Sequence, residues 1–292
     1  MKIYLASLYL PILLKYHERF PDRKLNVLRS FGQLDNQDYG FIKEHRQKLG
    51  GLILDSGTWT LNNAKQPSLR INFPTYKRHL AIFKDYYDHY FNFDADFNDD
   101  AFESNLGYQL DMEREGLNPV PVIHDIFGRE IDYYIKRGYQ RVALGSKQIR
   151  TLEQLEYVMN KFKGTGIKVH LFGKSGFDFL SEFPIDSTDT ADWVHEGKYG
   201  DILYWNPENG GLNKGDRIYM EEYIQHIEKK KVTFSNYKYR EALQKYLQDT
   251  LGITYEDILG PGGAHVKMLI NVHYYAQLED TINRIHQEKG FI

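Results

Sequence analysis

Leu52-Ile53-Leu54-Asp55-Ser56-Gly57 is a short apolar run that ends in a carboxylate, a hydroxyl and a glycine. Short apolar runs bounded by such residues are typical of buried strands. Three later segments have the same form: Val120-Pro121-Val122-Ile123-His124-Asp125, Val142-Ala143-Leu144-Gly145-Ser146 and Val169-His170-Leu171-Phe172-Gly173. In an α/β barrel, the carboxyl ends of the parallel strands meet at one mouth. The repetition therefore predicts a single site that is assembled from several strand ends.

Strands and helices are expected to alternate along residues 1–215. Strands are predicted near residues 2–6, 26–31, 51–55, 90–94, 120–124, 140–144, 167–172 and 201–205, with another short one near 183–187. Helices are predicted between them, for example over 129–137, which stops at Gly138, and over 151–162, which opens with a Thr151–Gln154 capping box. Such alternation predicts a parallel sheet with right-handed crossovers. About eight strands in this length favour an α/β fold of the (β/α)8 TIM-barrel type over an open sheet.

Polar segments over residues 57–75 and 95–119 are predicted to be long loops above the barrel mouth. The strand pattern stops after about residue 216, and residues 219–231, 236–251 and 265–288 have helical spacing. We therefore expect a catalytic barrel domain over residues 1–215. A helical C-terminal extension over residues 216–292 is expected to pack on that barrel.

The charge balance argues against a broad basic surface. The chain has 37 Lys and Arg residues against 40 Asp and Glu residues, a formal net charge of -3. Nucleic-acid binding would therefore need a local patch. Lys229-Lys230-Lys231 is one candidate, although such a run is also typical of a solvated helix end.

The chain contains no cysteine, which excludes disulfides and thiolate metal sites. The opening segment Met1–Ser7 is too short for a signal peptide and is predicted to be a strand. No apolar run approaches the roughly 20 residues of a membrane span. We therefore expect a cytoplasmic protein with no membrane partner.

Two strand ends carry candidate catalytic or binding carboxylates. Asp55 is suited to act as a general acid, base or nucleophile, or it caps a turn. Asp94 and Asp96 follow an aromatic strand, where a carboxylate can accept hydrogen bonds from the N–H groups of a base. A solvated loop acid is the alternative, particularly for Asp96.

Histidines end two further strands. His124 and His170 can titrate near neutral pH or donate to a ring, or they are hydrogen-bonded wall residues. With Asp125 they could hold a metal, but nothing in the spacing requires it, so neither a metal nor another cofactor is expected. Gly145 and Ser146 form either an ordinary turn or a flat backbone surface beneath a ligand.

A second acid-rich segment is Ile185-Asp186-Ser187-Thr188-Asp189. Asp186 follows an apolar residue and precedes two small hydroxylic ones, which suits a nucleophilic carboxylate. The alternative is that Asp186, Asp189 and Asp192 cap the start of a helix.

Taken in order, these motifs resemble the tRNA-guanine transglycosylase superfamily of (β/α)8 barrels. The resemblance covers about residues 1–205 and is greatest to the branch, found in phages and bacteria, that inserts 7-deazaguanine bases into DNA. It implies that guanine is exchanged for a 7-deazaguanine through a covalent aspartyl-glycosyl intermediate, in the manner of retaining glycosidases. The implied partners are DNA, with its target guanine flipped out, and the 7-deazaguanine base.

The resemblance also implies roles for individual residues. Asp186 would be the nucleophile, with Asp189 as its rival, and Asp55 would be the general acid and base. Asp94 would read the guanine-like edge. The other implied substrate-binding residues are Ser56, Gly57, His124, Gly145, Ser146 and His170. His124 stands where the tRNA enzymes have a glutamine, so the resemblance does not define its role.

Other functions remain compatible with the sequence. The tRNA enzymes have a cysteine-rich zinc site, which this chain cannot form, and this favours DNA over tRNA as the substrate. A tRNA-guanine transglycosylase-like enzyme and a nucleoside or glycoside hydrolase on the same barrel are alternatives. An inactive, nucleic-acid-binding barrel subunit is another. The 7-substituent, the target sequence, and the participation of a partner protein or a second copy of the chain are left open.

Overall fold

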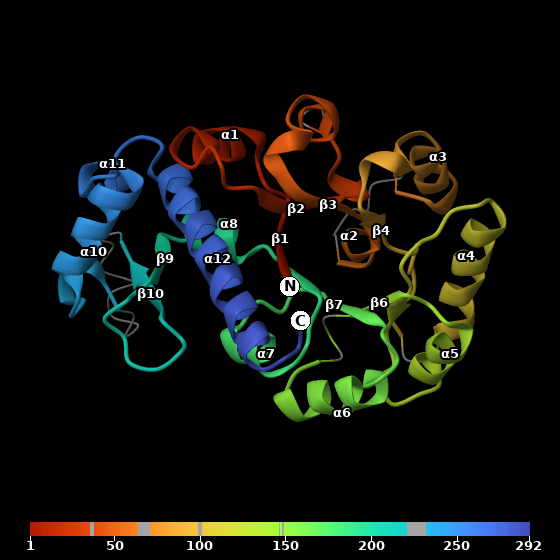
Figure 1. Ribbon diagram of the computed structural model, residues 1–292. Coiled ribbons are helices and arrows are strands. Elements are labelled where there is room, and N and C mark those ends of the chain that lie inside the picture. The colour runs from red at the N-terminus through yellow and green to blue at the C-terminus, as the bar shows by residue number, and fades with distance from the viewer. Residues whose placement is uncertain (36–37, 64–70, 99–100, 146, 148, 221–231) are drawn as a thin grey trace. The chain divides into compact units, whose positions relative to one another are not determined.

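Eight parallel strands form the main sheet of the protein (Figure 1). The computed structural model describes residues 1–35, 38–63, 71–98, 101–145, 147, 149–220 and 232–292. The strands are β1 (Lys2–Ala6), β2 (Leu25–Ser30), β3 (Leu49–Asp55), β4 (His89–Tyr90), β5 (Val122–Ile123), β6 (Arg141–Leu144), β7 (Lys168–Leu171) and β8 (Ser187–Thr190).

The strands follow the cyclic order of a TIM-like barrel. Their order in the sheet is β4-β3-β2-β1-β8-β7-β6-β5. The chain segments at its two edges meet through a parallel bridge between Phe91 and Val120. The N–H of Asn92 donates to the carbonyl of Val120 over 2.9 Å, and the N–H of Val120 donates to the carbonyl of Tyr90 over 2.8 Å. The prediction of an α/β barrel is therefore confirmed.

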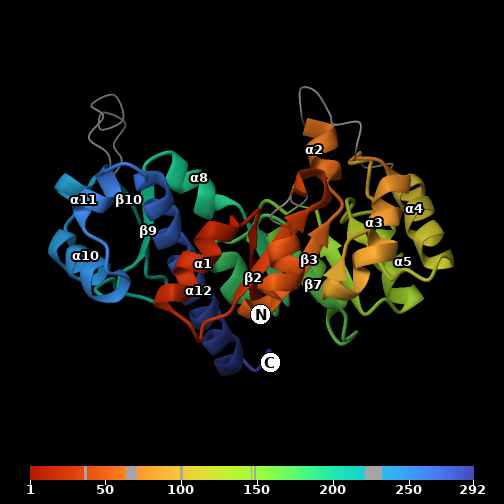
Figure 2. The same ribbon diagram turned by 90° about the horizontal axis from the view of Figure 1, so that it is seen from above.

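Helices connect the strands, and Figure 2 shows several of them around the sheet. In chain order they are α1 (Leu10–Arg19), α2 (Thr58–Asn63), α3 (Phe73–Phe83), α4 (Phe102–Arg114), α5 (Glu130–Arg137), α6 (Leu152–Phe162) and α7 (Phe177–Glu182). Short 3-10 or π-helical turns cover 31–33, 40–44, 46–48 and 84–86.

Local signals place α5 and α6 as predicted. Helix α5 ends at Gly138, whose φ of 72° is left-handed and favours glycine at a helix end. Helix α6 begins after Thr151, whose side chain accepts the N–H of Gln154 in a capping box. Both helices bury an apolar face, as their spacing predicts.

The strand predicted near residues 201–205 is present as β9 (Asp201–Trp205), but it pairs antiparallel with β10 (Gly215–Tyr219) in a separate two-stranded sheet and is not a barrel strand. Two other predictions are wrong. The eighth barrel strand is β8, at residues 187–190, whose Ser, Thr and Asp residues lack an apolar strand pattern. The segments expected to be loops contain α2 and α4, because polar helices do not show the spacing of a strongly apolar face.

The barrel strands fall in one of two compact units, made of residues 1–10, 24–190 and 285–292. The second unit contains residues 11–23 and 191–284. Its elements after residue 190 are α8 (Asp192–Lys198), β9, β10, a 3-10 turn at 234–236, α10 (Arg240–Tyr246), a π-helical turn at 247–251, α11 (Tyr255–Leu259) and most of α12 (Gly263–Glu288).

Asn271 on α12 forms hydrogen bonds to the backbone of α8 and β9 within the second unit. Its Oδ1 accepts the N–H of Leu203 over 2.7 Å, and its Nδ2 donates to the carbonyls of Trp193 and Asp201. The helices predicted over 236–251 and 265–288 are present. The helix predicted over 219–231, with Lys229–Lys231, lies largely outside the described residues, and the domain boundary at residue 215 stays a prediction. In the described part of the chain, no helix has the length and apolar character needed to cross a membrane.

The barrel interior contains a compact aromatic and aliphatic cluster. Its buried members are Tyr4, Leu28, Ile53, Phe91, Val120, Val122 and Ala143. The ring of Phe91 is fully buried and lies 4.6 Å from the ring of Phe172, centroid to centroid. A second buried cluster contains residues of α4, α5 and α6 together with β5, β6 and β7.

Phe91→Ala should lower the free energy of unfolding by about 3–5 kcal/mol, because it leaves a cavity that the rigid barrel fills poorly. Phe127→Ala is the matched control, since Phe127 is 64% exposed. Urea titration of both variants at one pH measures the difference. Equal losses in the two variants would contradict a packed barrel centre at Phe91.

Candidate active site

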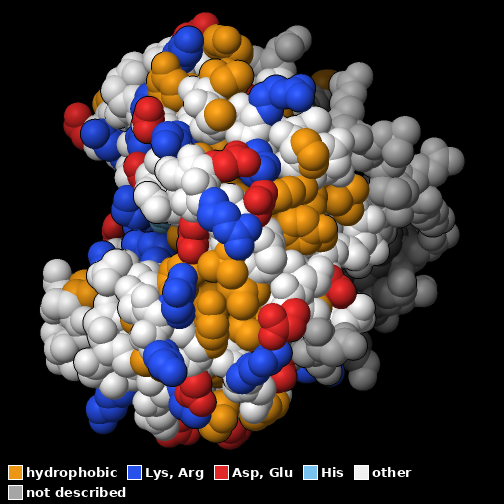
Figure 3. All heavy atoms as spheres, turned by 90° about the vertical axis from the view of Figure 1, so that its right-hand side faces the viewer, with side chains coloured by type: hydrophobic (Ala, Val, Ile, Leu, Met, Phe, Trp, Pro, Cys, Tyr) orange, Lys and Arg blue, Asp and Glu red, His pale blue; other side chains and the backbone are white. Residues whose placement is uncertain are grey.

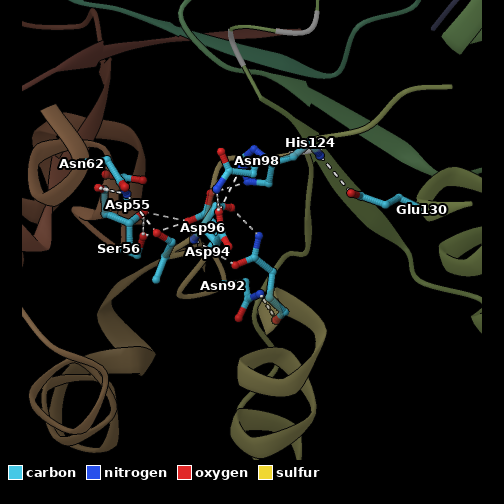
Figure 4. Close-up of polar contacts among 12 residues, drawn as sticks. Asp55, Ser56, Asn62, Asn92, Asp94, Asp96, Asn98, His124 and Glu130 are labelled. Carbon is cyan, nitrogen blue, oxygen red and sulfur yellow. Dashed lines mark hydrogen bonds and ion pairs between the residues drawn. The ribbon is translucent and has the colours of Figure 1, made fainter. Parts of the chain in front are cut away.

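Three carboxylates gather at the barrel mouth, which is the end where the strands have their carboxyl termini. Asp55 ends β3, Asp94 follows β4, and Asp189 is the third residue of β8. The charges of Asp94 and Asp189 both act on Asp55 strongly enough to raise its pKa. Figure 4 shows Asp55, Asp94 and His124 around one site. The predicted assembly from strand ends is therefore present for these residues.

Asp55 is held by groups from two neighbouring strand ends. Its Oδ2 accepts the N–H of Gly57 over 3.0 Å and the hydroxyl of Ser30 over 3.2 Å. Gly57 has a φ of 84°, and a Cβ there would lie 2.5 Å from the backbone nitrogen of Gly32. Glycine is thus required to turn the chain and aim its N–H at the carboxylate.

The environment of Asp55 favours a protonated carboxyl group. Burial raises its pKa from the ordinary value of 3.8 to about 7, and the charges of Asp94 and Asp189 add to this effect. The hydrogen bonds from Gly57 and Ser30 lower the pKa of Asp55, but by less than burial raises it. Asp55 as a whole residue is partly exposed.

Asp94 is fastened by two hydroxyls and an imidazole. Its Oδ1 accepts hydrogen bonds from Ser56 over 3.1 Å and from Thr58 over 2.9 Å. Its Oδ2 lies 2.9 Å from Nε2 of His124. Ser56 is fully buried, so it holds Asp94 and cannot touch a substrate directly. Its predicted role in substrate binding is therefore indirect at most.

His124 is held by contacts to both its ring and its backbone. The ring stacks on Phe97 at a centroid distance of 5.1 Å, and the backbone N–H donates to Oε2 of Glu130 over 2.9 Å. Burial lowers the pKa of His124, but the hydrogen bond and charge of Asp94 outweigh burial, so the pKa is raised overall. The shift favours the protonated imidazole beside the Asp94 carboxylate.

Gly145 makes room for His124. A Cβ at Gly145 would lie 3.2 Å from Nδ1 of His124, and the N–H of Gly145 already donates to the carbonyl of Ile123 over 3.0 Å. The N–H of Gly145 is therefore already engaged within the protein, and the predicted backbone contact from Gly145 to a flat ligand stays a prediction. Ser146 lies outside the described residues.

Asp189 faces the same mouth from β8. Its Oδ1 accepts the N–H of Gly173 over 3.0 Å and lies 3.4 Å from Nε2 of His170. The side chain of Asp189 is 13% exposed, so it is not completely enclosed. His170 has no exposed surface and lies beneath Asp189 rather than at the surface where a substrate would bind.

Asp186 lies at the other end of β8, so its predicted pairing with Asp55 is wrong. It precedes the strand and forms ion pairs with Arg141 and Lys168, the first residues of β6 and β7. The amino-terminal ends of parallel barrel strands point away from the mouth. Asp186 therefore stabilises the base of the barrel.

The remaining candidates have structural partners. Asp96 accepts the N–H of Asn98 over 3.0 Å, as expected for a loop acid. In the described part of the chain, no three His, Asp or Glu side chains group together as a metal site would require. Sequence reasoning missed Ser30, Thr58 and Phe97. Ser30 was the easiest of these to predict from the sequence, because it ends β2 directly beside Asp55.

Comparison with known proteins adds little to this description. No family model matches the chain, and no curated protein matches it. A solved structure whose backbone is similar over part of its length is an L-talarate dehydratase from Polaromonas sp. JS666, with a TM-score of 0.42 and 14% sequence identity. The match covers 67% of this chain and 54% of the dehydratase chain. The chain thus spans about half the length of that dehydratase, and so distant a likeness does not bear on the chemistry.

Asp55→Asn should make folding less sensitive to pH between about 5 and 8. Because the folded state raises the pKa of Asp55 to about 7, Asp55 stabilises the fold at low pH and this stabilisation is lost as the pH rises through 7. The Tm of the wild type should fall more between pH 5 and pH 8 than that of the variant. A difference of about 2 °C or more is expected, since about 1 kcal/mol moves the Tm of a domain of this size by that much.

Asp22→Asn, at an exposed aspartate, is the control for general charge effects. Calorimetric scans at both pH values measure the difference. If wild type and Asp55→Asn lose Tm in parallel, Asp55 is not held protonated in the folded protein.

Proposed function

We propose that the protein is a base-exchanging glycosyltransferase that replaces guanine in DNA with a 7-deazaguanine. One observation carries the proposal: three carboxylates share the barrel mouth, and burial with mutual repulsion raises the pKa of Asp55 among them to about 7. Glycosyl transfer with retention needs an ionised carboxylate to attack the sugar and a protonated one to serve the leaving group. Carboxylates whose environments separate their protonation states are suited to these two roles.

Asp189 is proposed as the nucleophile, in place of Asp186. A carboxylate oxygen of Asp189 forms a bond to the anomeric carbon as the bond to guanine breaks, and guanine leaves with the proton of Asp55. In the second half, the incoming 7-deazaguanine gives a proton to Asp55 and attacks the same carbon, which releases Asp189. Two inversions give net retention. The position of Asp189 at the mouth supports this assignment.

Asp55 suits the acid and base role because it must change protonation twice in each cycle. A pKa of about 7 keeps both forms populated near neutral pH. An ordinary carboxyl, with a pKa near 3.8, would be deprotonated almost all the time and would donate poorly. Its exposed edge gives it access to the departing base.

Asp94 and His124 are proposed to recognise the guanine-like edge. Oδ1 of Asp94 already accepts two hydroxyls, whereas Oδ2 accepts one group and has room for one more. A ring N–H or amino group of a guanine-like base fits that acceptor. A protonated His124 supplies the complementary donor for a carbonyl oxygen.

DNA is proposed as the substrate in preference to tRNA. The proposed setting is the cytoplasm of a bacterium or of a phage-infected host. The chain has no cysteine with which to build the zinc site of the tRNA enzymes it resembles. A duplex base must be flipped out before it reaches the mouth, which costs a few kcal/mol. Trp59 on α2 is 57% exposed and offers a stacking face that would offset part of that cost.

Asp189→Asn should abolish the covalent protein–DNA adduct and lower base exchange by roughly a thousandfold or more, because the attacking oxygen is lost. The adduct is measured on a denaturing gel after mixing the protein with end-labelled, guanine-containing DNA strands. Exchange is measured as labelled guanine released when a 7-deazaguanine is supplied.

Asp186→Asn is the matched control, since it removes the same charge three residues away at the other end of the strand. It should keep the adduct at a rate within a few-fold of the wild type below its Tm. An adduct that persists in Asp189→Asn and disappears in Asp186→Asn would reverse the assignment. Guanine released into water without incorporation of the 7-deazaguanine would instead identify a hydrolase.

Binding to DNA should weaken as the salt concentration rises. The slope of log affinity against log salt concentration should reflect a small number of local phosphate contacts. On the face seen in Figure 3, acidic and basic side chains are interspersed rather than gathered into one basic field. Lys147 and Arg150, both exposed after β6, are candidates near the mouth, and Nζ of Lys147 lies 5.7 Å from the ring centroid of Phe97. Each phosphate contact contributes about -0.9 to the slope of log affinity against log salt for duplex DNA.

The double substitution Lys147→Ala and Arg150→Ala should reduce that slope by up to about 2, as measured by fluorescence anisotropy across a salt series. Lys161→Ala is the control, because Lys161 pairs with Asp132 on the outer helices. A wild-type affinity that does not change with salt would contradict nucleic-acid binding.

A further inference from the structure

His170 is a buried polar side chain that the proposed exchange chemistry leaves without a task. Its ring has no exposed surface and packs between Phe91 and Phe172, at centroid distances of 4.9 Å and 4.7 Å. This packing fixes the ring plane. A histidine buried among aromatic rings needs partners for both ring nitrogens, because an unsatisfied buried polar group costs about 1–3 kcal/mol.

The two ring nitrogens face different partners. Nδ1 lies 2.9 Å from Oγ of Ser187, at the start of β8. Nε2 is buried, makes no hydrogen bond at full geometry to a described residue, and lies 3.4 Å from Oδ1 of Asp189. That distance is long for a hydrogen bond, and a shift of a few tenths of an ångström would close it.

The partners determine which nitrogen carries the proton. If Nδ1 carried it, the lone pair of Nε2 would face a carboxylate oxygen, which is repulsive. If Nε2 carries it, the Ser187 hydroxyl donates to Nδ1 and Nε2–H points at Asp189. Of the two neutral tautomers, only the second gives both nitrogens an attractive partner, and it shares its Nε2–H with the protonated ring.

We propose that His170, oriented by Ser187, is a positioning residue that fixes the carboxylate of Asp189 for attack. Oδ1 of Asp189 then takes two donors, Nε2–H of His170 and the N–H of Gly173, at 3.4 Å and 3.0 Å. With Oδ1 engaged below, Oδ2 is the oxygen presented to the sugar. The proposal rests on the proposed function in assigning Asp189 as the nucleophile.

The energetic reason is preorganisation. A carboxylate that is free to rotate spends part of its time with neither oxygen aligned to the anomeric carbon. Groups behind a reacting atom that restrict its rotation raise the rate, and a misplacement of 1 Å can cost about a hundredfold. Here the restraint comes from a ring that the aromatic barrel centre already holds.

The test compares His170→Leu with His170→Gln. The leucine removes both polar contacts, whereas the glutamine amide keeps an N–H donor near the position of Nε2. Under single-turnover conditions with end-labelled, guanine-containing DNA, His170→Leu should form the covalent adduct 10–100 times more slowly than the wild type. The DNA concentration that gives half the maximal rate should not change, and His170→Gln should recover most of the rate.

Ser187→Ala provides a second variant in case His170→Leu fails to fold. It removes a single buried hydroxyl, and it should slow adduct formation several-fold, whereas Ser187→Thr should not. Wild-type rates in both His170→Leu and Ser187→Ala would overturn the proposal. Equal losses in His170→Leu and His170→Gln would also overturn it, because they would indicate a packing role only.

Nitrogen-15 NMR of histidine-labelled full-length protein gives a readout that does not need activity. The proposal expects the His170 proton on Nε2 in the wild type and a shift of the Nε2 signal in Asp189→Asn. A proton on Nδ1, or an Nε2 signal unmoved in Asp189→Asn, would refute the contact even if base exchange occurs. An expected NMR result with no adduct from the wild type would refute the proposed function while leaving the His170–Asp189 contact intact.

Discussion

Asp55, Asp94 and Asp189 share one barrel mouth, and the charges of Asp94 and Asp189 add to the burial that raises the pKa of Asp55. The site relieves this repulsion unequally. Asp94 has two hydroxyls and an imidazole, and Asp189 has a backbone N–H and the edge of a histidine. Asp55 has one backbone N–H and one serine hydroxyl, too little to offset its burial. The pKa of Asp55 is therefore raised to about 7, and this shift distinguishes Asp55 within the group.

Glycines and small hydroxylic residues at the strand ends allow these groups to come so close. Gly57 turns the chain at a positive φ, where a side chain would strike Gly32. Gly145 leaves the space that the imidazole of His124 occupies. Both glycines were expected to contact a ligand directly, whereas the structure shows them beside Asp55 and His124, whose positions they allow.

Much of the barrel could be predicted from the sequence, because strands such as β1 and β3 are apolar runs and α6 has a complete cap. The eighth strand could not, since Ser187–Thr190 has no apolar residue. Its placement decides which acid reaches the mouth. Asp186 and Asp189 are three residues apart, which is about 10 Å along a strand. An error of three residues in placing the strand therefore assigns the wrong aspartate to the mouth.

Asp55 and Asp94 could be predicted as candidate site residues from the sequence, because Asp55 ends an apolar strand and Asp94 ends the aromatic segment that begins with β4. The partners of Asp94 and Asp189 were harder to find, since Thr58 lies in a helix and Ser187 in a polar strand. Hydrogen bonds between side chains far apart in the chain leave no periodic signal. They depend on the closed barrel, which only the fold as a whole provides.

The closure of the barrel between β4 and β5 has a consequence for motion. Both strands have two residues, and they meet through the Phe91–Val120 bridge. Asp94 follows β4 and His124 follows β5, so their 2.9 Å contact joins the two chain segments that close the barrel. A motion that separated these segments would also separate Asp94 from His124. The geometry of this part of the candidate site therefore depends on the closure of the barrel.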